Sequence, residues 1–165
     1  MIEANTRCFA QGLKLLAALT DEQYAERRGD WSPVGAQYRH VVEHGQCLLA
    51  GVAIGRVDYD SRARDQNVEQ SRLKAIEATT ELIRRLAELG GWPENHPLSV
   101  QMRCNPDSPE GCWAESTLGR ELQFLVSHTI HHFALIKLLL ANQPIRLEGG
   151  FGTAPSTLSH HRLNR

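Results

Sequence analysis

Apolar residues recur every three to four positions along four long stretches of this chain, and this period constrains the fold more than any other feature. The stretches cover residues 2–20, 32–54, 67–89 and 116–142. An α-helix completes a turn every 3.6 residues, so each stretch predicts a helix with one apolar face. Four such faces cover one another well in a four-helix bundle. We therefore expect an all-α fold that forms a single domain over residues 1–165.

Local signals predict where two of these helices begin. Ser32 is expected to cap the second helix, and Pro33 takes its first position, where a missing N–H costs nothing. The third helix is expected to begin at a capping box, with Asn67 as the cap and Gln70 reaching back to it.

The connection between the third and fourth helices is long and rich in proline. Residues 92–115 are therefore expected to form an irregular crossover before the last helix, with a short extended piece at 98–104. A connection of this length allows a topology other than simple up-down-up-down. Residues 143–165 contain GGFGTAPSTL and are expected to form an irregular tail.

Composition and charge exclude several classes of function. The formal net charge is −1, so no strong field attracts nucleic acid or an anionic membrane. No apolar run is long enough for a transmembrane helix, and the N-terminal residues do not resemble a secretory signal. The four cysteines then suggest free thiols in a reducing compartment. We expect a cytoplasmic protein with no nucleic-acid partner and no membrane contact.

Five of the eight histidines lie in two tight groups. His128 and His132 are four residues apart in the last helix, which places both imidazoles on one face. That face is otherwise apolar, so the pair is expected to point inward, whereas His131 projects toward its edge. His40 and His44 repeat the spacing on the second helix. Helix bundles build metal sites from side chains on facing helices, and imidazole is a ligand of zinc, nickel and iron.

Two interpretations of these histidines remain open at this point. One or two histidines of the second helix, together with His128 and His132, would supply three or four nitrogen ligands to a metal. Three ligands with an open position are typical of a catalytic site, whereas four ligands are typical of a structural site. The alternative is that the imidazoles are core residues, each with a local hydrogen-bond partner.

Four segments, WSPVGAQYRHVVEH, VDYDSRARD, LGRELQFLVSHTIHHFALIKLLL and FGTAPSTL, span most of the chain. Their order and spacing resemble the DinB-like (YfiT-like) superfamily of metal-binding four-helix bundles. The resemblance implies metal ligands at His128 and His132 and one ligand from the second helix. It favours His40 for that ligand, with His44 as the alternative. In the most similar subgroup a histidine often stands where this chain has Gln37.

The resemblance also implies a class of activity. Members of the family transfer thiols to small electrophiles, or isomerise substrates with the help of a thiol, using bacillithiol, mycothiol or glutathione. We therefore expect a divalent metal (zinc, nickel or iron), a small-molecule substrate and, as a candidate cofactor, a low-molecular-weight thiol. The enzyme would be a metal-dependent transferase or hydrolase. The alternative is a non-enzymatic protein in which a metal ties helices together. The resemblance further implies a homodimer.

Three other residues are candidates for a role at the site. Glu121 lies on the same helix face as the histidine pair and could act as a catalytic base, although an ion pair with Arg120 is the alternative. Arg62 and Arg64 lie among aspartates in YDSRARD and could bind the carboxylates of a thiol or of an acidic substrate. A solvated loop with internal ion pairs is the alternative there.

Overall fold

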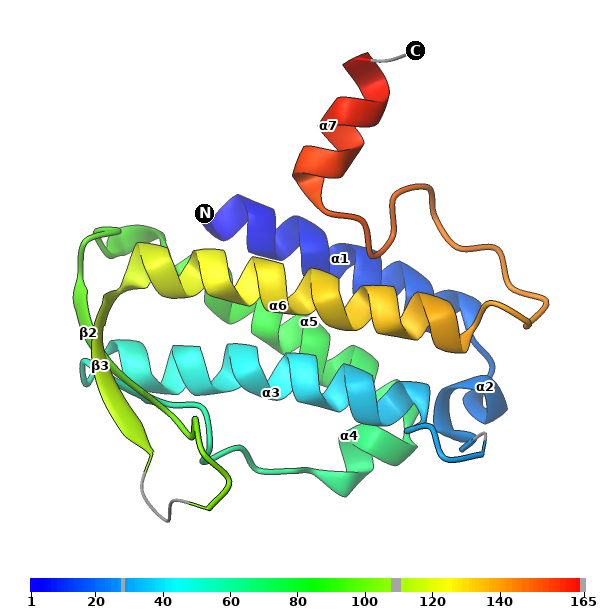
Figure 1. The fold of residues 1–165 in the computed structure, drawn as a ribbon, viewed down its shortest axis with the longest axis horizontal. Coiled ribbons are helices and arrows are strands. Elements are labelled where there is room, and N and C mark those ends of the chain that lie inside the picture. The colour runs from blue at the N-terminus through cyan, green and yellow to red at the C-terminus, as the bar shows by residue number, and fades with distance from the viewer. Residues whose placement is uncertain (28, 108–110, 164–165) are drawn as a thin grey trace.

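Four long helices run side by side through the computed structural model, which describes residues 1–27, 29–107 and 111–163 (Figure 1). They are α1 (Ile2–Ala18), α3 (Val34–Val52), α5 (Arg72–Glu88) and α6 (Leu118–Leu139). Helices α1 and α3 each contact both α5 and α6, so the four apolar faces enclose a shared core. The chain is mostly helical, as its apolar period predicts.

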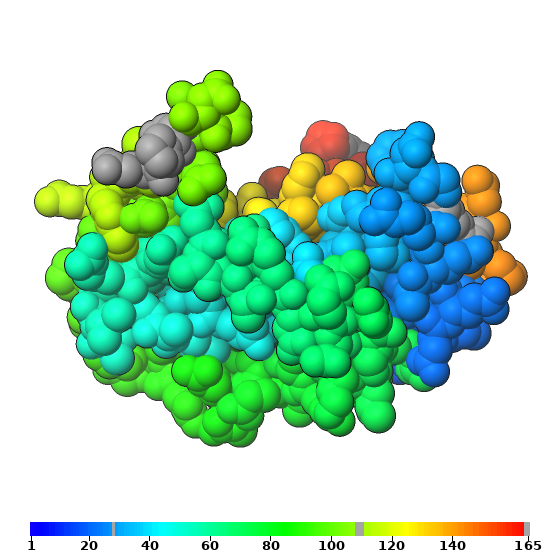
Figure 2. All heavy atoms as spheres, turned by 90° about the horizontal axis from the view of Figure 1, so that it is seen from below, coloured from blue at the N-terminus to red at the C-terminus, as the bar shows by residue number. Residues whose placement is uncertain are grey.

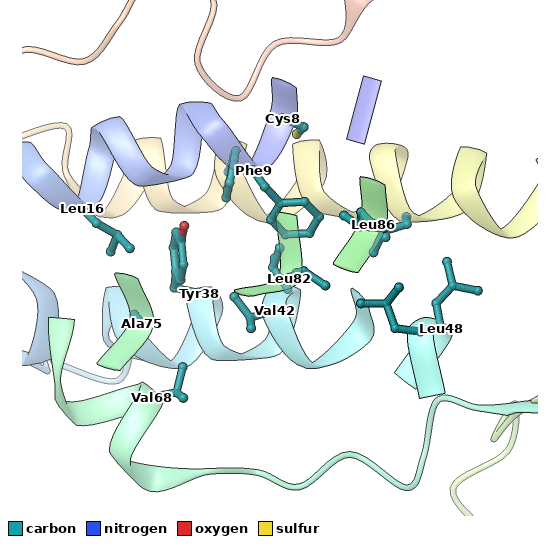
Figure 3. Close-up of a cluster of buried hydrophobic side chains, with 14 of the residues drawn as sticks. Cys8, Phe9, Leu16, Tyr38, Val42, Leu48, Val68, Ala75, Leu82 and Leu86 are labelled. Atoms are coloured by element: carbon teal, nitrogen blue, oxygen red, sulfur yellow. The ribbon is translucent and has the colours of Figure 1, made fainter. Parts of the chain in front are cut away.

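The core contains large side chains that are fully removed from solvent. Figure 3 shows Phe9 and Leu16 of α1 converging with Val42 of α3 and Leu82 of α5. Burying one such side chain contributes about 1.5–3 kcal/mol to folding. These contacts pack α5 against both α1 and α3. None of the helices in the described part of the chain is both long and apolar enough to cross a membrane.

The connection between α1 and α3 holds a short helix, and α3 begins one residue later than expected. Helix α2 (Asp21–Ala25) starts at a capping box between Thr20 and Gln23. Pro33 is the N-cap of α3, so the expected cap at Ser32 is wrong. The Ser32 hydroxyl instead accepts a hydrogen bond from the Gln37 amide, with Nε2 and Oγ 3.2 Å apart.

The expected third helix is divided in two. Helix α4 (Gln66–Gln70) ends at Ser71, whose extended backbone (φ −119°, ψ 111°) turns the chain before its side chain caps α5. Asp65 caps α4 by accepting a hydrogen bond from the backbone N–H of Asn67 at 2.8 Å. The predicted capping box at Asn67 is therefore wrong, because the aspartate two residues earlier takes the capping position. A 3₁₀ turn (Leu89–Gly91) follows α5.

Two strands form within the expected crossover and pair with a third strand from an earlier loop, so the all-α expectation is wrong here, whereas the extended piece expected at 98–104 is confirmed by the strand at 97–102. The strands are β1 (Arg56–Asp58), β2 (Pro97–Met102) and β3 (Cys112–Thr117). Strand β1 pairs in parallel with β2, and β2 pairs antiparallel with β3. The sheet lies at one end of the long helices (Figure 1). It anchors the loop after β1, which runs back along α3.

The tail after α6 is less irregular than expected. Phe151 is 2% exposed and stacks on Phe133 of α6, with ring centroids 4.8 Å apart. Gly152 has a φ of +63°, and a Cβ there would lie 2.7 Å from the backbone nitrogen of Ala134, so glycine permits this close approach. The tail ends in α7 (Pro155–Leu163), which projects away from the other helices (Figure 1).

Gly35 lets α4 approach α3 closely, and we expect Gly35→Ala to destabilise the protein. A Cβ at this position would collide with the backbone oxygen of Glu69 and lie 2.9 Å from the ring of Tyr24. Backbone cannot move aside as a side chain can, so the free energy of unfolding should fall by about 1–3 kcal/mol. Urea unfolding measures this change. Gly90→Ala is the control, because nothing lies within 4 Å of its added Cβ. An equal decrease in the free energy of unfolding of both variants would contradict the prediction.

Candidate metal centre

Three imidazoles meet between α3 and α6. His40 comes from α3, and His128 and His132 come from consecutive turns of α6. Each ring contributes one nitrogen, and these three nitrogens all lie within 4.8 Å of one another. Among the described residues, these are the three that form a group able to hold a metal ion. We call them the histidine triad. The two imidazoles predicted to share a face of the last helix do so, and they point toward the second long helix.

His44 packs against the triad, but both of its ring nitrogens have other partners. Its Nδ1 lies 2.8 Å from the carbonyl oxygen of His40 and donates to it. Its Nε2 lies 3.4 Å from Nη1 of Arg62 and accepts from that guanidinium. One neutral tautomer satisfies both contacts. Of the two histidines left open by the spacing on this helix, the structure therefore brings His40 into the triad and keeps His44 beside it.

The triad fits a divalent metal. Nε2 of His128 is buried and has no hydrogen-bond partner among the described residues. Leaving a buried polar atom unpaired costs about 1–3 kcal/mol, and a metal shared with two neighbouring rings would remove that cost. Imidazole nitrogens are common ligands of zinc, which they bind at about 2.0–2.1 Å. Three neutral ligands would leave a coordination position open for a small molecule.

The four clustered histidines are neutral at physiological pH, as metal binding requires. Burial is the main cause, and it lowers the pKa of His40 to about 2 and that of His44 to about 3. Burial likewise lowers the pKa of His128 and of His132 to about 4. Repulsion from nearby imidazoles and from the Arg62 guanidinium adds to the effect in each case. Protons therefore compete little with a metal at pH 7.

Gln37 fixes the ring of His132. Its Oε1 lies 2.7 Å from Nδ1 of His132, and its Nε2 donates to Ser32. Because an amide oxygen only accepts, Nδ1 of His132 carries the proton and Nε2 keeps the lone pair for a metal. Sequence reasoning noted Gln37 only as a departure from related chains. Its spacing of three and seven residues from His40 and His44 places it on the same helix face and could have indicated this contact.

We expect Gln37→Leu to weaken metal binding. Hydrogen-bond partners that orient metal-bound histidines change metal affinity by about 10–100-fold. Leucine would remove the Gln37 oxygen that accepts from Nδ1 of His132. Competition against a chromophoric chelator measures the affinity. Gln37→Glu keeps an acceptor in the same place and should bind within a few-fold of the unmodified protein. Unchanged affinity in Gln37→Leu would show that the contact does not orient the ring.

Glu121 hydrogen-bonds to Tyr59 and Ser116, and it is not part of the group of possible metal ligands among the described residues. Its Oε2 accepts a hydrogen bond from the Tyr59 hydroxyl at 2.8 Å, and its Oε1 accepts from Ser116 at 2.6 Å. The ring of Tyr59 in turn stacks on His44, with centroids 5.4 Å apart. These contacts occupy both carboxylate oxygens and tie α6 to the sheet and to the loop after β1. A catalytic role for Glu121 stays a prediction, and its contacts favour a positioning role.

Arg62 and Arg64 take different positions around the site. Arg62 is half-buried, and its Nη1 donates to the carbonyl oxygen of Tyr59 at 3.0 Å as well as to His44. Its Nε lies 4.0 Å from the buried carboxylate of Glu43. Arg64 is exposed and has a φ of 52°, which is uncommon outside glycine. The structure thus places the charge of Arg62 beside the histidines. Substrate binding by either arginine stays a prediction.

Figure 2 shows the outline of the molecule dipping between the β2–β3 hairpin and the segment that leads into α3, with parts of α3 and α6 visible between them. The triad belongs to these two helices, and its rings are partly exposed. Each triad residue therefore keeps some contact with solvent.

Comparison with known proteins gives two findings. The sequence model of the DinB superfamily matches residues 5–136, a range that contains the whole triad. The chain is also similar to FK506-binding protein 5 of Rhizopus delemar, with 30% identity over 119 residues. That alignment covers 72% of this chain and 31% of the fungal protein, so the chain spans about a third of the relative's length.

Proposed function

Because this chain belongs to the DinB superfamily and brings three neutral imidazoles together, we propose that it binds one divalent metal through His40, His128 and His132. The observation that carries the proposal is the buried Nε2 of His128, which lies beside two other rings and has no hydrogen-bond partner in the described part of the chain. Zinc, nickel and iron all accept imidazole ligands, so availability and geometry decide the native metal.

The proposed activity is that of a metal-dependent transferase or hydrolase acting on a small molecule, with a low-molecular-weight thiol as the candidate cosubstrate. A divalent metal lowers the pKa of a bound thiol or water, which supplies a nucleophile at neutral pH. The hydrogen bonds of His44 keep it out of the triad, which supports an open position rather than a closed four-ligand site. The guanidinium of Arg62 would stabilise an anionic nucleophile nearby.

In this proposal the four long helices form a four-helix bundle that holds the ligands on facing helices. The second candidate function uses the same residues differently. Since the triad joins α3 to α6, a metal there could serve only to tie these helices together. A structural metal would raise the unfolding temperature without supporting turnover. The homodimer expected from the resemblance stays a prediction.

Metal analysis followed by a turnover assay separates these functions. Untagged protein purified without chelator should contain about one metal per chain. Metal-loaded and chelator-treated samples are then compared in the conjugation of glutathione, bacillithiol and mycothiol to 1-chloro-2,4-dinitrobenzene, and in the hydrolysis of p-nitrophenyl acetate. Turnover that depends on the metal would support the enzyme. Metal that stabilises the protein without turnover would support the structural role, and protein that binds no metal would refute both.

A further inference from the structure

Glu43 is a buried carboxylate on α3 to which the proposed function gives no role. It follows His40 by three residues and is 3% exposed. Burying a carboxylate is costly unless cations or N–H groups compensate its charge. Its Oε1 accepts a hydrogen bond from the backbone N–H of Asp65 at 2.7 Å, and its Oε2 lies 4.0 Å from Nε of Arg62. Both oxygens of Glu43 therefore contact the loop after β1.

The end of this loop is fixed against α3 and α4. The residue that Glu43 binds, Asp65, also caps α4 by accepting from the backbone N–H of Asn67 at 2.8 Å. Arg39, one turn before Glu43 on α3, donates to the carbonyl oxygen of Arg64 at 3.4 Å. The loop therefore has a defined position beside α3, and Glu43 supplies the buried contact that holds it there.

Arg62 lies within this loop and directs its charge at the triad. Its side chain is 19% exposed, and its Nη1 donates to the carbonyl oxygen of Tyr59 at 3.0 Å and to His44 at 3.4 Å. Its Nε is buried, lacks a hydrogen bond to any described residue and lies nearest to the charge of Glu43. None of these contacts uses Nη2. Because the guanidinium is planar, fixing Nε and Nη1 also fixes the direction of Nη2.

We propose that Glu43 is a positioning residue, which holds Arg62 so that its guanidinium offers Nη2 to an anion bound at the open position of the triad. The anion rests on the proposed function, whereas the positioning of Arg62 needs no metal. A guanidinium donates along fixed directions, so its orientation matters as well as its charge. An arginine that had to be ordered by the anion itself would lose side-chain entropy on binding.

Nuclear magnetic resonance of the metal-free, ¹⁵N-labelled protein tests the positioning. The Nε–H signal of Arg62, assigned by its loss in Arg62→Lys, should exchange slowly with water because Nε is buried. In Glu43→Gln this exchange should be at least about tenfold faster, because local opening then costs less. Glutamine keeps an oxygen for the N–H of Asp65 and removes only the charge that faces Arg62. Glu69→Gln is the matched control, because Glu69 pairs with Arg39 of the same helix at 2.7 Å.

Titration of the cobalt(II)-loaded protein with azide, followed by visible absorption, tests the consequence for an anion. Azide should bind about tenfold more weakly to Glu43→Gln than to the unmodified protein, because the guanidinium is no longer held in place. A carboxylate that only screened the charge of Arg62 would have the opposite effect, since its neutralisation would strengthen anion binding. Glu43→Asp keeps the charge but withdraws it by one methylene, so it should also weaken azide binding, whereas screening alone predicts no change.

The two measurements separate this inference from the proposed function. Unchanged exchange of the Arg62 Nε–H in Glu43→Gln would overturn the positioning. Azide binding that is equal or stronger in both Glu43→Gln and Glu43→Asp would overturn it as well, while the metal bound by these variants would leave the proposed function intact. Protein that binds no metal, but whose Nε–H exchanges faster in Glu43→Gln, would refute the proposed function and support the positioning of Arg62.

Discussion

His132→Ala is expected to reduce the metal content from about one per chain to near zero while leaving the helices intact. The variant removes one of three nitrogens that meet within 4.8 Å, and the two that remain cannot enclose a metal. His128→Ala should have the same effect, and it also removes the buried Nε2 that has no partner among the described residues. Elemental analysis measures the metal, and far-ultraviolet circular dichroism measures the helix content.

The chain offers a matched control for this result. His131 is the neighbour of His132 and is exposed, and it does not belong to the triad. His131→Ala should therefore retain its metal. Equal loss in His131→Ala would point to a general effect on the helix, and full retention in His132→Ala would show that the triad does not bind the metal.

The metal-free protein is expected to lose stability steeply as the pH falls from 7 to 5. Burial lowers the pKa of His44 from 6.5 to about 3 in the folded protein. Below pH 6.5 the unfolded chain takes up a proton that the folded chain excludes, so stability present above pH 6.5 is lost as the pH falls toward 3. His44 is 2% exposed, and its contribution alone is about 2 kcal/mol at pH 5. The three triad histidines act in the same direction.

Urea unfolding at pH 7, 6 and 5 checks this expectation. In His44→Leu the free energy of unfolding should depend less strongly on pH, since leucine takes up no proton in either state. His161→Leu is the control, because His161 is exposed near the end of α7 and should leave the dependence unchanged. Bound metal should raise the free energy of unfolding at each pH without removing this loss, because a ligated imidazole also excludes the proton that the unfolded chain takes up. A metal-free protein that is equally stable at pH 7 and pH 5 would contradict the burial of these rings.

Features that depend on neighbours in the chain could be predicted from the sequence. The apolar period indicated the four long helices, because helix formation and one-sided burial both follow from local spacing. The same spacing determined that His128 and His132 share a face of α6. The resemblance favoured His40 over His44, and the triad agrees with that choice. The break at Ser71 could not be predicted, because the apolar residues on both sides of it keep the helical period.

What the sequence by itself determined is therefore the existence of the four long helices and the pair of imidazoles on one face of α6. Only the tertiary structure decided which histidine of α3 joins that pair, because His40 and His44 are equivalent by spacing. The choice depends on Arg62, which the loop after β1 brings to the Nε2 of His44. That loop is held by pairing between Val57 and Val100, two residues far apart in the chain. Contacts between distant segments form only when the whole core packs, and no local pattern encodes them.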